Sequence, residues 1–297
     1  MLPSNLGKKS AKLIDGKALA DKILLDLRNK IVKLPKPPGL GVVLIGDDPA
    51  SALYVSSKKK ACLKVGINFY DYVCGGQDHA NDTEADVVKI IEYLNNNTDV
   101  DAIIVQLPMP ENFNRQKIID ALAIAKDVDG LHSQNRQDFT QGSRAMTPPL
   151  VRAVMEAINS TGENLEQKKV VIVAKSPTFA QPIAEELQHK GLTVTTVAPG
   201  KQMAEIVKTA DLLISVIGKP GLITADMIKP NAMVIDIGTT LVGEKTWAGD
   251  VDPAAANVAS WLTPVPGGIG PLTVAMLLRN TYDLAVKKQK SQMASGE

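Results

Sequence analysis

The chain has 297 residues, a length typical of two domains, and an apolar fraction of 44% that is sufficient for sizeable hydrophobic cores. A net charge of +1 argues against a general nucleic-acid binder, and two cysteines with three histidines indicate neither a disulfide framework nor a His-rich metal site. Residues 1–16 contain no apolar run of the signal-peptide type, and no stretch approaches the roughly 18 apolar residues of a membrane span. We therefore expect a soluble cytoplasmic protein.

Short runs of aliphatic and β-branched residues alternate with longer segments of helical character. The runs end in Gly, Pro or Ser and predict strands at 39–46, 101–110, 169–176, 192–200, 211–221 and 232–240. The segments between them predict helices at 18–34, 51–65, 84–95, 149–159 and 182–190, and a last helix at 272–287. This alternation is typical of a mainly parallel α/β sheet with helices on both faces, in which ligands bind at the carboxyl ends of the strands.

The predicted strands divide the chain into two α/β domains. Four of them lie within about 70 residues of the second half, which suits a compact Rossmann-like unit. We expect a first domain of residues 1–147 plus 272–297 and a Rossmann-like dinucleotide-binding domain of residues 148–271, with the active-site cleft between them.

Several side chains suited to chemistry follow the strands of the first half. Tyr54 and Lys58 lie four residues apart and share a helix face, where they could stack a flat ligand and carry protons, although the spacing also fits an ordinary surface helix. Gln106 ends a strand, where it could bind a lysine or satisfy loop backbone. Asp127 and Asp129 could bind an amino-substituted heterocycle or form Asx turns.

Two segments of the second half have the composition of ligand-binding loops. The sequence 263–273, "TPVPGGIGPLT", concentrates proline and glycine, so its backbone can approach a ligand closely. The segment 170–187, "VVIVAKSPTFAQPIAEEL", joins a strand to a helix in the manner of a dinucleotide-binding unit. It lacks the glycines that such a junction normally carries, because Ala174–Gln181 contains none.

Taken together and in this order, these motifs resemble the bifunctional methylenetetrahydrofolate dehydrogenase/methenyltetrahydrofolate cyclohydrolase family. The matching segments are "DGKALA", "DDPASALYVSSKKKACLKVGI", "VQLPMP", "KDVDG", "ISVIGKPG", "VIDIGTT", "GDVD" and "TPVPGGIGPLTVAMLLRNT". The resemblance extends from about Leu13 to Thr281, which is nearly the whole chain.

The resemblance implies a role for each matching residue. Lys58 would be the central catalytic lysine, Gln106 would tune it by a hydrogen bond, Tyr54 would stack on the folate and Asp129 would bind the pterin. The remaining substrate-binding residues would be Pro266, Gly267, Gly268, Pro271 and Thr273. The cofactor-binding residues would be Ala174, Lys175, Ser176, Gly218, Gly238, Thr239 and Gly270.

The resemblance also implies partners and a cellular role. Tetrahydrofolate derivatives would be the substrates, NADP the cofactor, and no metal, nucleic acid or membrane would take part. The protein would be a cytoplasmic homodimer, associating through the second domain, and would serve one-carbon metabolism and purine biosynthesis.

The sequence departs from the family pattern mainly in the cofactor half. The family usually has Gly-(Arg/Ala)-Ser-x-x-Val-Gly-x-Pro at 174–182, where this chain has alanine in place of both glycines. The segments 145–148, 198–201 and 236–240 also differ, and Gln137 stands where the family has the glycine of Asn-x-Gly.

Three interpretations of these departures stay open at the level of sequence. Each alanine adds one methyl group, which the backbone tolerates if φ is negative, and the cofactor then still binds. Lys175 and Lys201 could hold a 2′-phosphate, and no acid ends the strand 192–200, which favours NADP over NAD. Alternatively, the methyl groups and Phe179 close the site and leave only the cyclohydrolase, or the protein is a non-catalytic folate-binding relative.

Overall fold

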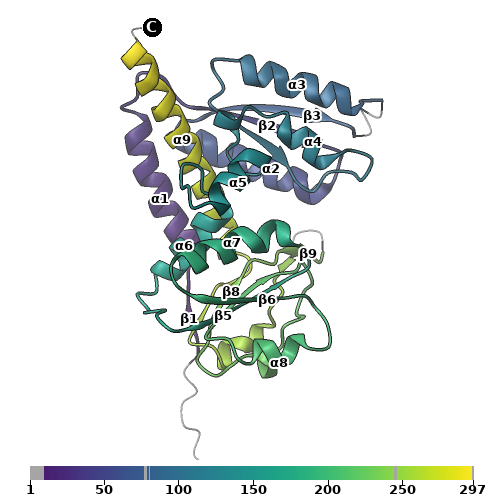
Figure 1. The fold of residues 1–297 in the computed structure, drawn as a ribbon, viewed down its shortest axis with the longest axis vertical. Helices are drawn as coiled ribbons and strands as arrows, with labels where there is room; N and C mark the ends of the chain where they lie inside the picture. The colour runs from purple at the N-terminus through teal and green to yellow at the C-terminus, as the bar shows by residue number, and fades with distance from the viewer. Residues whose placement is uncertain (1–9, 77–78, 80, 244–245, 296–297) are drawn as a thin grey trace, which may run out of the picture. The chain divides into compact units, whose positions relative to one another are not determined.

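The computed structural model describes residues 10–76, 79, 81–243 and 246–295. The expectation that residues 1–16 contain no apolar run of the signal-peptide type concerns in part residues 1–9, which are outside the described residues. The chain divides into two compact units: unit 1 holds Leu150–Thr273 with the described part of Met1–Leu19, and unit 2 holds Ala20–Pro149 with the described part of Val274–Glu297. Each unit is an α/β structure, as the sequence predicts (Figure 1).

Unit 1 is built on a six-stranded sheet of order β1-β11-β8-β7-β5-β6, in which every pairing is parallel. Its strands are β1 Lys12–Leu13, β5 Lys169–Ala174, β6 Thr193–Val197, β7 Leu212–Val216, β8 Met233–Asp236 and β11 Trp261–Leu262. A separate antiparallel pair joins β9 Thr240–Leu241 to β10 Trp247–Ala248. Unit 1 also contains the α-helices α7 Pro177–His189 and α8 Met203–Val207, together with all of α6 Pro149–Asn159 except Pro149. The 3₁₀ segments are η3 Ala225–Met227 and η4 Pro253–Asn257.

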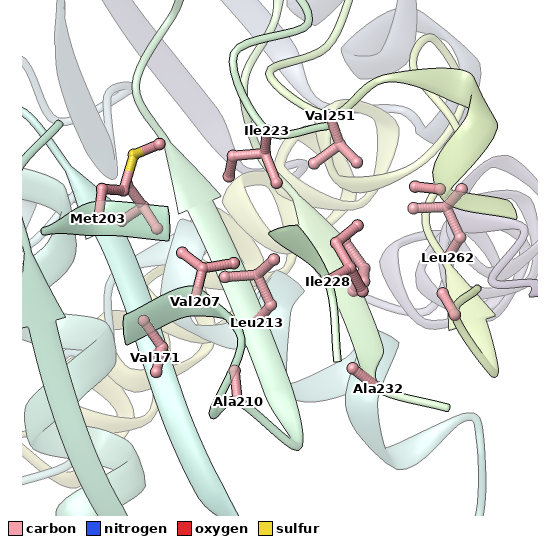
Figure 2. Close-up of a cluster of buried hydrophobic side chains, with 14 of the residues drawn as sticks. Val171, Met203, Val207, Ala210, Leu213, Ile223, Ile228, Ala232, Val251 and Leu262 are labelled. Carbon is pink, nitrogen blue, oxygen red and sulfur yellow. The ribbon is translucent and has the colours of Figure 1, made fainter. Parts of the chain in front are cut away.

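The sheet of unit 1 has a buried apolar layer on the face that carries α8. Val171 and Val173 of β5 and Leu213 of β7 pack there with Met203 and Val207 of α8 (Figure 2). Because side chains alternate along a strand, Val170, Ile172 and Ala174 point to the opposite face. That face is covered by α7, which contacts β5 and β6 (Figure 1).

Unit 2 contains a three-stranded parallel sheet of order β3-β2-β4. The strands are β2 Gly39–Ile45, β3 Asn68–Cys74 and β4 Ala102–Gln106. The helices that lie entirely in unit 2 are α2 Pro49–Val65, α3 Glu84–Asn96, α4 Arg115–Asp120, α5 Ser133–Thr140 and the 3₁₀ segment η2 Ile124–Lys126. Val43 and Ile45 of β2 share an apolar cluster with Ile91 and Leu94 of α3, so α3 covers one face of this sheet.

Two long helices each contribute residues to both units. Helix α1 spans Gly16–Ile31, and α9 spans Ile269–Ser295. Within the described part of the chain, no helix has both the length and the apolar character needed to cross a membrane.

Two sequence predictions are wrong in detail. The helix predicted at 182–190 begins at Pro177, because Ser176 caps it and proline is favoured in a first helical turn, so Pro182 lies inside the helix. The described residues 10–19 lie in unit 1 and not in the predicted first domain, since β1 pairs with β11 in the sheet of unit 1. The other predicted domain boundaries stay predictions, and they lie within a few residues of the limits of the two units.

Candidate active site

Helix α2 carries Lys58 on its buried side. Asp48 caps the helix by accepting a hydrogen bond from the Ser51 amide at 2.8 Å, and Gly66 ends it at φ +88°. The buried positions Val55, Lys58, Cys62 and Val65 recur at helical spacing. Lys58 is therefore directed inward, while Lys59 and Lys60 are exposed, as the helix geometry predicts.

Gln106 meets Lys58 from the neighbouring strand. Ile103 and Val105 of β4 face the apolar cluster under α3, so the alternation of the strand directs Gln106 to the opposite face. There the Lys58 Nζ donates a hydrogen bond to Gln106 Oε1. The Gln106 Nε2 donates to the Leu107 carbonyl at 2.5 Å, which fixes the orientation of the amide. The predicted lysine–glutamine pair is present.

Asp129 is the second ionisable group beside Lys58. Burial lowers the pKa of Lys58, and the charge of Asp129 opposes that shift. Burial also raises the pKa of Asp129 to about 6, against the opposing effect of the Lys58 charge. The buried site therefore favours the neutral form of both the lysine and the carboxyl, which are the forms that take up and release protons in general acid–base catalysis.

The structure separates the roles of the two aspartates in the loop after η2. Asp127 is buried, and its Oδ2 accepts hydrogen bonds from the His132 amide at 2.9 Å and from Asn135 Nδ2 at 2.8 Å. This aspartate therefore organises the start of α5. Asp129, which the family resemblance assigns to pterin binding, is the member of the pair whose charge acts on Lys58.

Tyr54 lies one turn before Lys58 on α2 and is partly buried. Cys62 lies one turn after Lys58, and burial raises the pKa of its thiol to about 12. The thiol is therefore protonated at neutral pH and behaves as part of the apolar surface beneath the lysine. No group of three or more potential metal ligands occurs among the described residues.

The proline- and glycine-rich loop of unit 1 is packed against the start of α1. A Cβ on Gly16 would lie 1.9 Å from the Gly268 carbonyl oxygen, and a Cβ on Gly268 would lie 2.5 Å from the Pro264 carbonyl oxygen. The Lys17 amide donates to the Gly267 carbonyl at 2.8 Å, and Gly267 has φ +106°. Contact with backbone atoms therefore requires glycine at 16 and 268, and the positive φ favours glycine at 267. No local sequence pattern predicts this contact, because the two segments are about 250 residues apart.

The remaining loop residues extend into α9. Pro266 is exposed, while Pro271 and Thr273 are partly buried, and the Thr273 hydroxyl donates to the Ile269 carbonyl at 3.0 Å. A Cβ on Gly270 would meet no atom within 4 Å.

The cofactor segment forms the end of β5 and the first turns of α7. Ser176 caps α7 and accepts from the Thr178 amide at 3.3 Å, and Lys175 and Ser176 are exposed. Helix N-termini favour anions because their first amides lack partners within the helix. Gly218 follows β7 with φ +72°, and Gly238 and Thr239 follow β8. The predicted cofactor residues outside the 263–273 loop thus lie at or just after the carboxyl ends of strands in one sheet.

Both halves of the chain match models of one protein family. Residues 14–129 match the tetrahydrofolate dehydrogenase/cyclohydrolase catalytic domain, and residues 147–289 match the NAD(P)-binding domain of the same family. The chain belongs to this family.

Individual tetrahydrofolate dehydrogenase/cyclohydrolases resemble the chain over nearly their full length. The bifunctional protein FolD of Moorella thermoacetica is 40% identical over 93% of this chain and 99% of its own. A FolD crystal structure from Campylobacter jejuni has a TM-score of 0.88 and 35% identity, covering 94% of this chain and 100% of its own. The Trypanosoma brucei enzyme, solved with NADP and an inhibitor, has a TM-score of 0.87 and 30% identity, covering 94% and 98%.

The alanines that replace the glycines of the tetrahydrofolate dehydrogenase/cyclohydrolase pattern are accommodated without backbone strain. Among the described residues other than glycine, a positive φ occurs at Gln167 and Asn231, and therefore at neither Ala174 nor Ala180. Ala174 is 5% exposed and Ala180 is 1% exposed. Both methyl groups are thus enclosed by the protein, whereas the Phe179 side chain is 41% exposed.

Proposed function

We propose that the chain oxidises 5,10-methylenetetrahydrofolate to 5,10-methenyltetrahydrofolate with NADP, and then hydrolyses this product to 10-formyltetrahydrofolate. The observation that carries the proposal is the buried Lys58–Gln106 hydrogen bond with Asp129 close to the lysine. A folate-binding module without catalysis would have no need of a desolvated lysine held by a glutamine.

The first step places few demands on acid–base groups of the protein. Bound NADP would supply the acceptor for the hydride that leaves the methylene carbon, which would convert the folate to a methenyl cation. We propose that Asp129 and Tyr54 hold the pterin, and that the 263–273 loop lines the binding site for the folate and the nicotinamide. These residues orient the reacting rings and exclude water, which is the main catalytic requirement of a direct transfer.

The second step requires proton transfer. Water adds to the methenyl carbon of the cation and loses a proton, and the ring then opens as a C–N bond breaks and the nitrogen gains a proton. Lys58 is suited to both transfers, since burial favours its neutral amine. Gln106 accepts a hydrogen bond from the lysine, which holds the Nζ in place.

A substitution of Lys58 tests this assignment. We expect Lys58→Met to reduce the rate of methenyltetrahydrofolate hydrolysis by about 100-fold or more, as is typical for loss of a general acid–base group. The decay of methenyltetrahydrofolate absorbance measures this rate. Lys60→Met is a matched control, because Lys60 is an exposed lysine of the same helix. Equal rates for wild type and Lys58→Met would refute the proposal.

NADP is the cofactor we favour over NAD. The strand β6 ends at Val197 and is followed by Ala198, so it offers no acid to the 2′-hydroxyl of an NAD ribose. Lys175 follows β5 and Lys201 follows the neighbouring β6, and both side chains are exposed. Two cations after adjacent strand ends are suited to a 2′-phosphate.

A cyclohydrolase that has lost the cofactor is the second candidate. It is favoured by the replacement of both loop glycines and by the exposed Phe179 beside them. The buried positions of the two alanine methyl groups favour the bifunctional enzyme. Incubation of the protein with methylenetetrahydrofolate and either NADP or NAD distinguishes the two candidates. If neither cofactor is reduced, the protein has no dehydrogenase activity and the cyclohydrolase alone remains.

The proposal extends to the setting of the enzyme. From the family resemblance we assign it to the cytoplasm, to one-carbon metabolism that supplies purine biosynthesis, and to a homodimer that associates through unit 1.

A further inference from the structure

Two buried carboxyl groups lie beneath the loops of unit 1 that the family resemblance assigns to ligand binding. Asp236 ends β8 and is 3% exposed, and Asp250 lies between β10 and η4 and is 0% exposed. Among the described residues, the hydrogen-bond donors to these two carboxyl groups are backbone amides and one hydroxyl, and not cationic side chains. Burial of a carboxylate is costly unless hydrogen bonds replace water, so its donors indicate what it does.

Asp250 binds the loop that follows β7. Its Oδ2 accepts hydrogen bonds from the Ser215 hydroxyl and the Ile217 amide, both at 2.7 Å, and its Oδ1 accepts from the Lys219 amide at 2.8 Å. The carboxylate therefore holds the amides on either side of Gly218. Gly218 itself has φ +72°, and a Cβ there would meet no atom within 4 Å.

Asp236 connects the neighbouring loops to the same network. Its Oδ1 accepts from the Gly238 amide at 2.9 Å and from the Asp250 amide at 3.2 Å, and its own amide donates to Thr263 Oγ1 at 2.7 Å. Thr263 begins the proline- and glycine-rich loop. Burial, and to a smaller extent the charge of Asp250, raises the pKa of Asp236 to about 7, against the opposing hydrogen bond from the Val251 amide.

The two carboxyls also explain two glycines. A Cβ on Gly238 would lie 2.1 Å from Asp250 Cγ, and a Cβ on Gly249 would lie 2.1 Å from Asp236 Oδ2. Any side chain at either position would displace a carboxyl group from its donors. Glycine at 238 is thus required by the packing of the loop, whether or not it also contacts a cofactor.

We propose that Asp250 is a positioning residue for the cofactor: its carboxylate fixes the Ile217–Lys219 loop in the shape that binds the dinucleotide. The inference rests on the proposed function, because it requires unit 1 to bind NADP. Charged hydrogen bonds to three donors pre-form the loop, so that NADP binding does not have to order it. Asp236 maintains the adjacent Gly238 segment in the same way.

The hydrolase reaction provides a control for folding, since it needs Lys58 of unit 2 and no dinucleotide. We expect Asp250→Asn to weaken NADP binding at least tenfold, measured by fluorescence titration, while methenyltetrahydrofolate hydrolysis stays within twofold of wild type. Ser215→Ala removes one of the three donors and should weaken NADP binding by two- to fivefold. The control Asp226→Asn alters an exposed acid of the same unit and should change neither quantity.

The outcomes are distinct. Unchanged NADP affinity in Asp250→Asn would overturn the inference and leave the proposed function intact. If Asp250→Asn loses NADP binding and methenyltetrahydrofolate hydrolysis to the same extent, Asp250 has only a folding role and the inference is overturned. If Asp250→Asn does not fold, an unchanged NADP affinity in Ser215→Ala overturns the inference. A wild-type protein that does not bind NADP would overturn both the inference and the NADP-dependent part of the proposed function.

Discussion

The four lysines of α2 differ in solvent exposure and in their partners, and therefore in their roles. Lys59 and Lys64 form exposed ion pairs with Asp71 and Asp21, which contribute little to stability. Lys58 is the buried member, and desolvation lowers its pKa. Spacing from Tyr54 identifies its helix face in the sequence, but its burial depends on packing against β4, which local sequence does not encode.

Lys175 tests the cofactor assignment at the scale of one residue. We expect Lys175→Ala to weaken NADP binding about tenfold and to leave NAD binding unchanged, because the lost cation would face a 2′-phosphate that only NADP carries. Cofactor titration by fluorescence measures both affinities.

The control for this titration is Lys168→Ala, an exposed lysine that lies just before β5, at the opposite end of the strand. It should affect neither cofactor. NADP affinity unchanged by Lys175→Ala would contradict the phosphate role and leave Lys201 as the remaining candidate.

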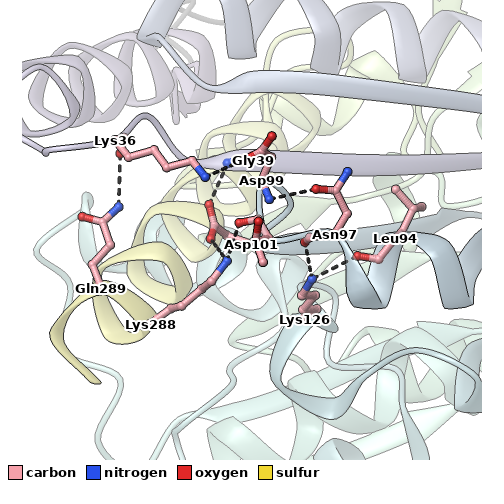
Figure 3. Close-up of polar contacts among 10 residues, drawn as sticks. Lys36, Gly39, Leu94, Asn97, Asp99, Asp101, Lys126, Lys288 and Gln289 are labelled. Carbon is pink, nitrogen blue, oxygen red and sulfur yellow. Dashed lines mark hydrogen bonds and ion pairs between the residues drawn. The ribbon is translucent and has the colours of Figure 1, made fainter. Parts of the chain in front are cut away.

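At the scale of elements, the end of α3 is held by side chains from elsewhere in unit 2. Lys126 donates to the Leu94 and Asn97 carbonyls at 3.0 and 2.8 Å, and Lys288 of α9 donates to the Thr98 carbonyl at 2.7 Å (Figure 3). Cations at a helix C-terminus satisfy carbonyls that lack partners within the helix. Lys288 also pairs with the buried Asp101 at 2.9 Å.

We expect Lys288→Met to lower the free energy of unfolding by about 1–2 kcal/mol, because Asp101 would lose its cation and keep only the Gly39 amide among its present donors. Urea denaturation measures the change. Lys287→Met is the matched control: its side chain is exposed, so the effect should stay within about 0.5 kcal/mol. Equal destabilisation by both substitutions would show that the pair with Asp101 is not the cause.

Elements with strong local signals agree closely with the sequence prediction. The predicted helix 149–159 matches α6, and the six predicted strands contain β2, β4, β5, β6, β7 and β8. The sequence does not predict strand β3, because "NFYDYVC" mixes polar and aromatic residues and its side chains are mostly exposed or partly buried. The two-residue strands β1 and β11 form only through pairing with distant segments, which no local pattern reveals.

At the scale of the whole molecule, the sequence predicts the family and the site better than it predicts contacts between distant segments. Lys58, Gln106 and Asp129 follow from motif and position. By contrast, the packing of Gly16 on Gly268 and the hydrogen bonds of Asp250 join segments that only the folded sheet brings together. Such contacts explain why certain loop residues are glycine or aspartate, which composition and periodicity do not.

The oligomeric state of the molecule is expected to depend on an edge strand of unit 1. Strand β6 has a partner only in β5 within the described sheet, and its unpaired edge could join that of a second chain. We expect wild type to sediment at twice the 31.7 kDa chain mass, and Thr193→Lys/Thr195→Lys to sediment as a monomer, because the two exposed positions would place like charges along the shared edge. Asn159→Lys/Ser160→Lys adds the same charge at the exposed end of α6 and should remain dimeric. A monomeric wild type would contradict the dimer, and a dimeric edge variant would exclude β6 as its interface.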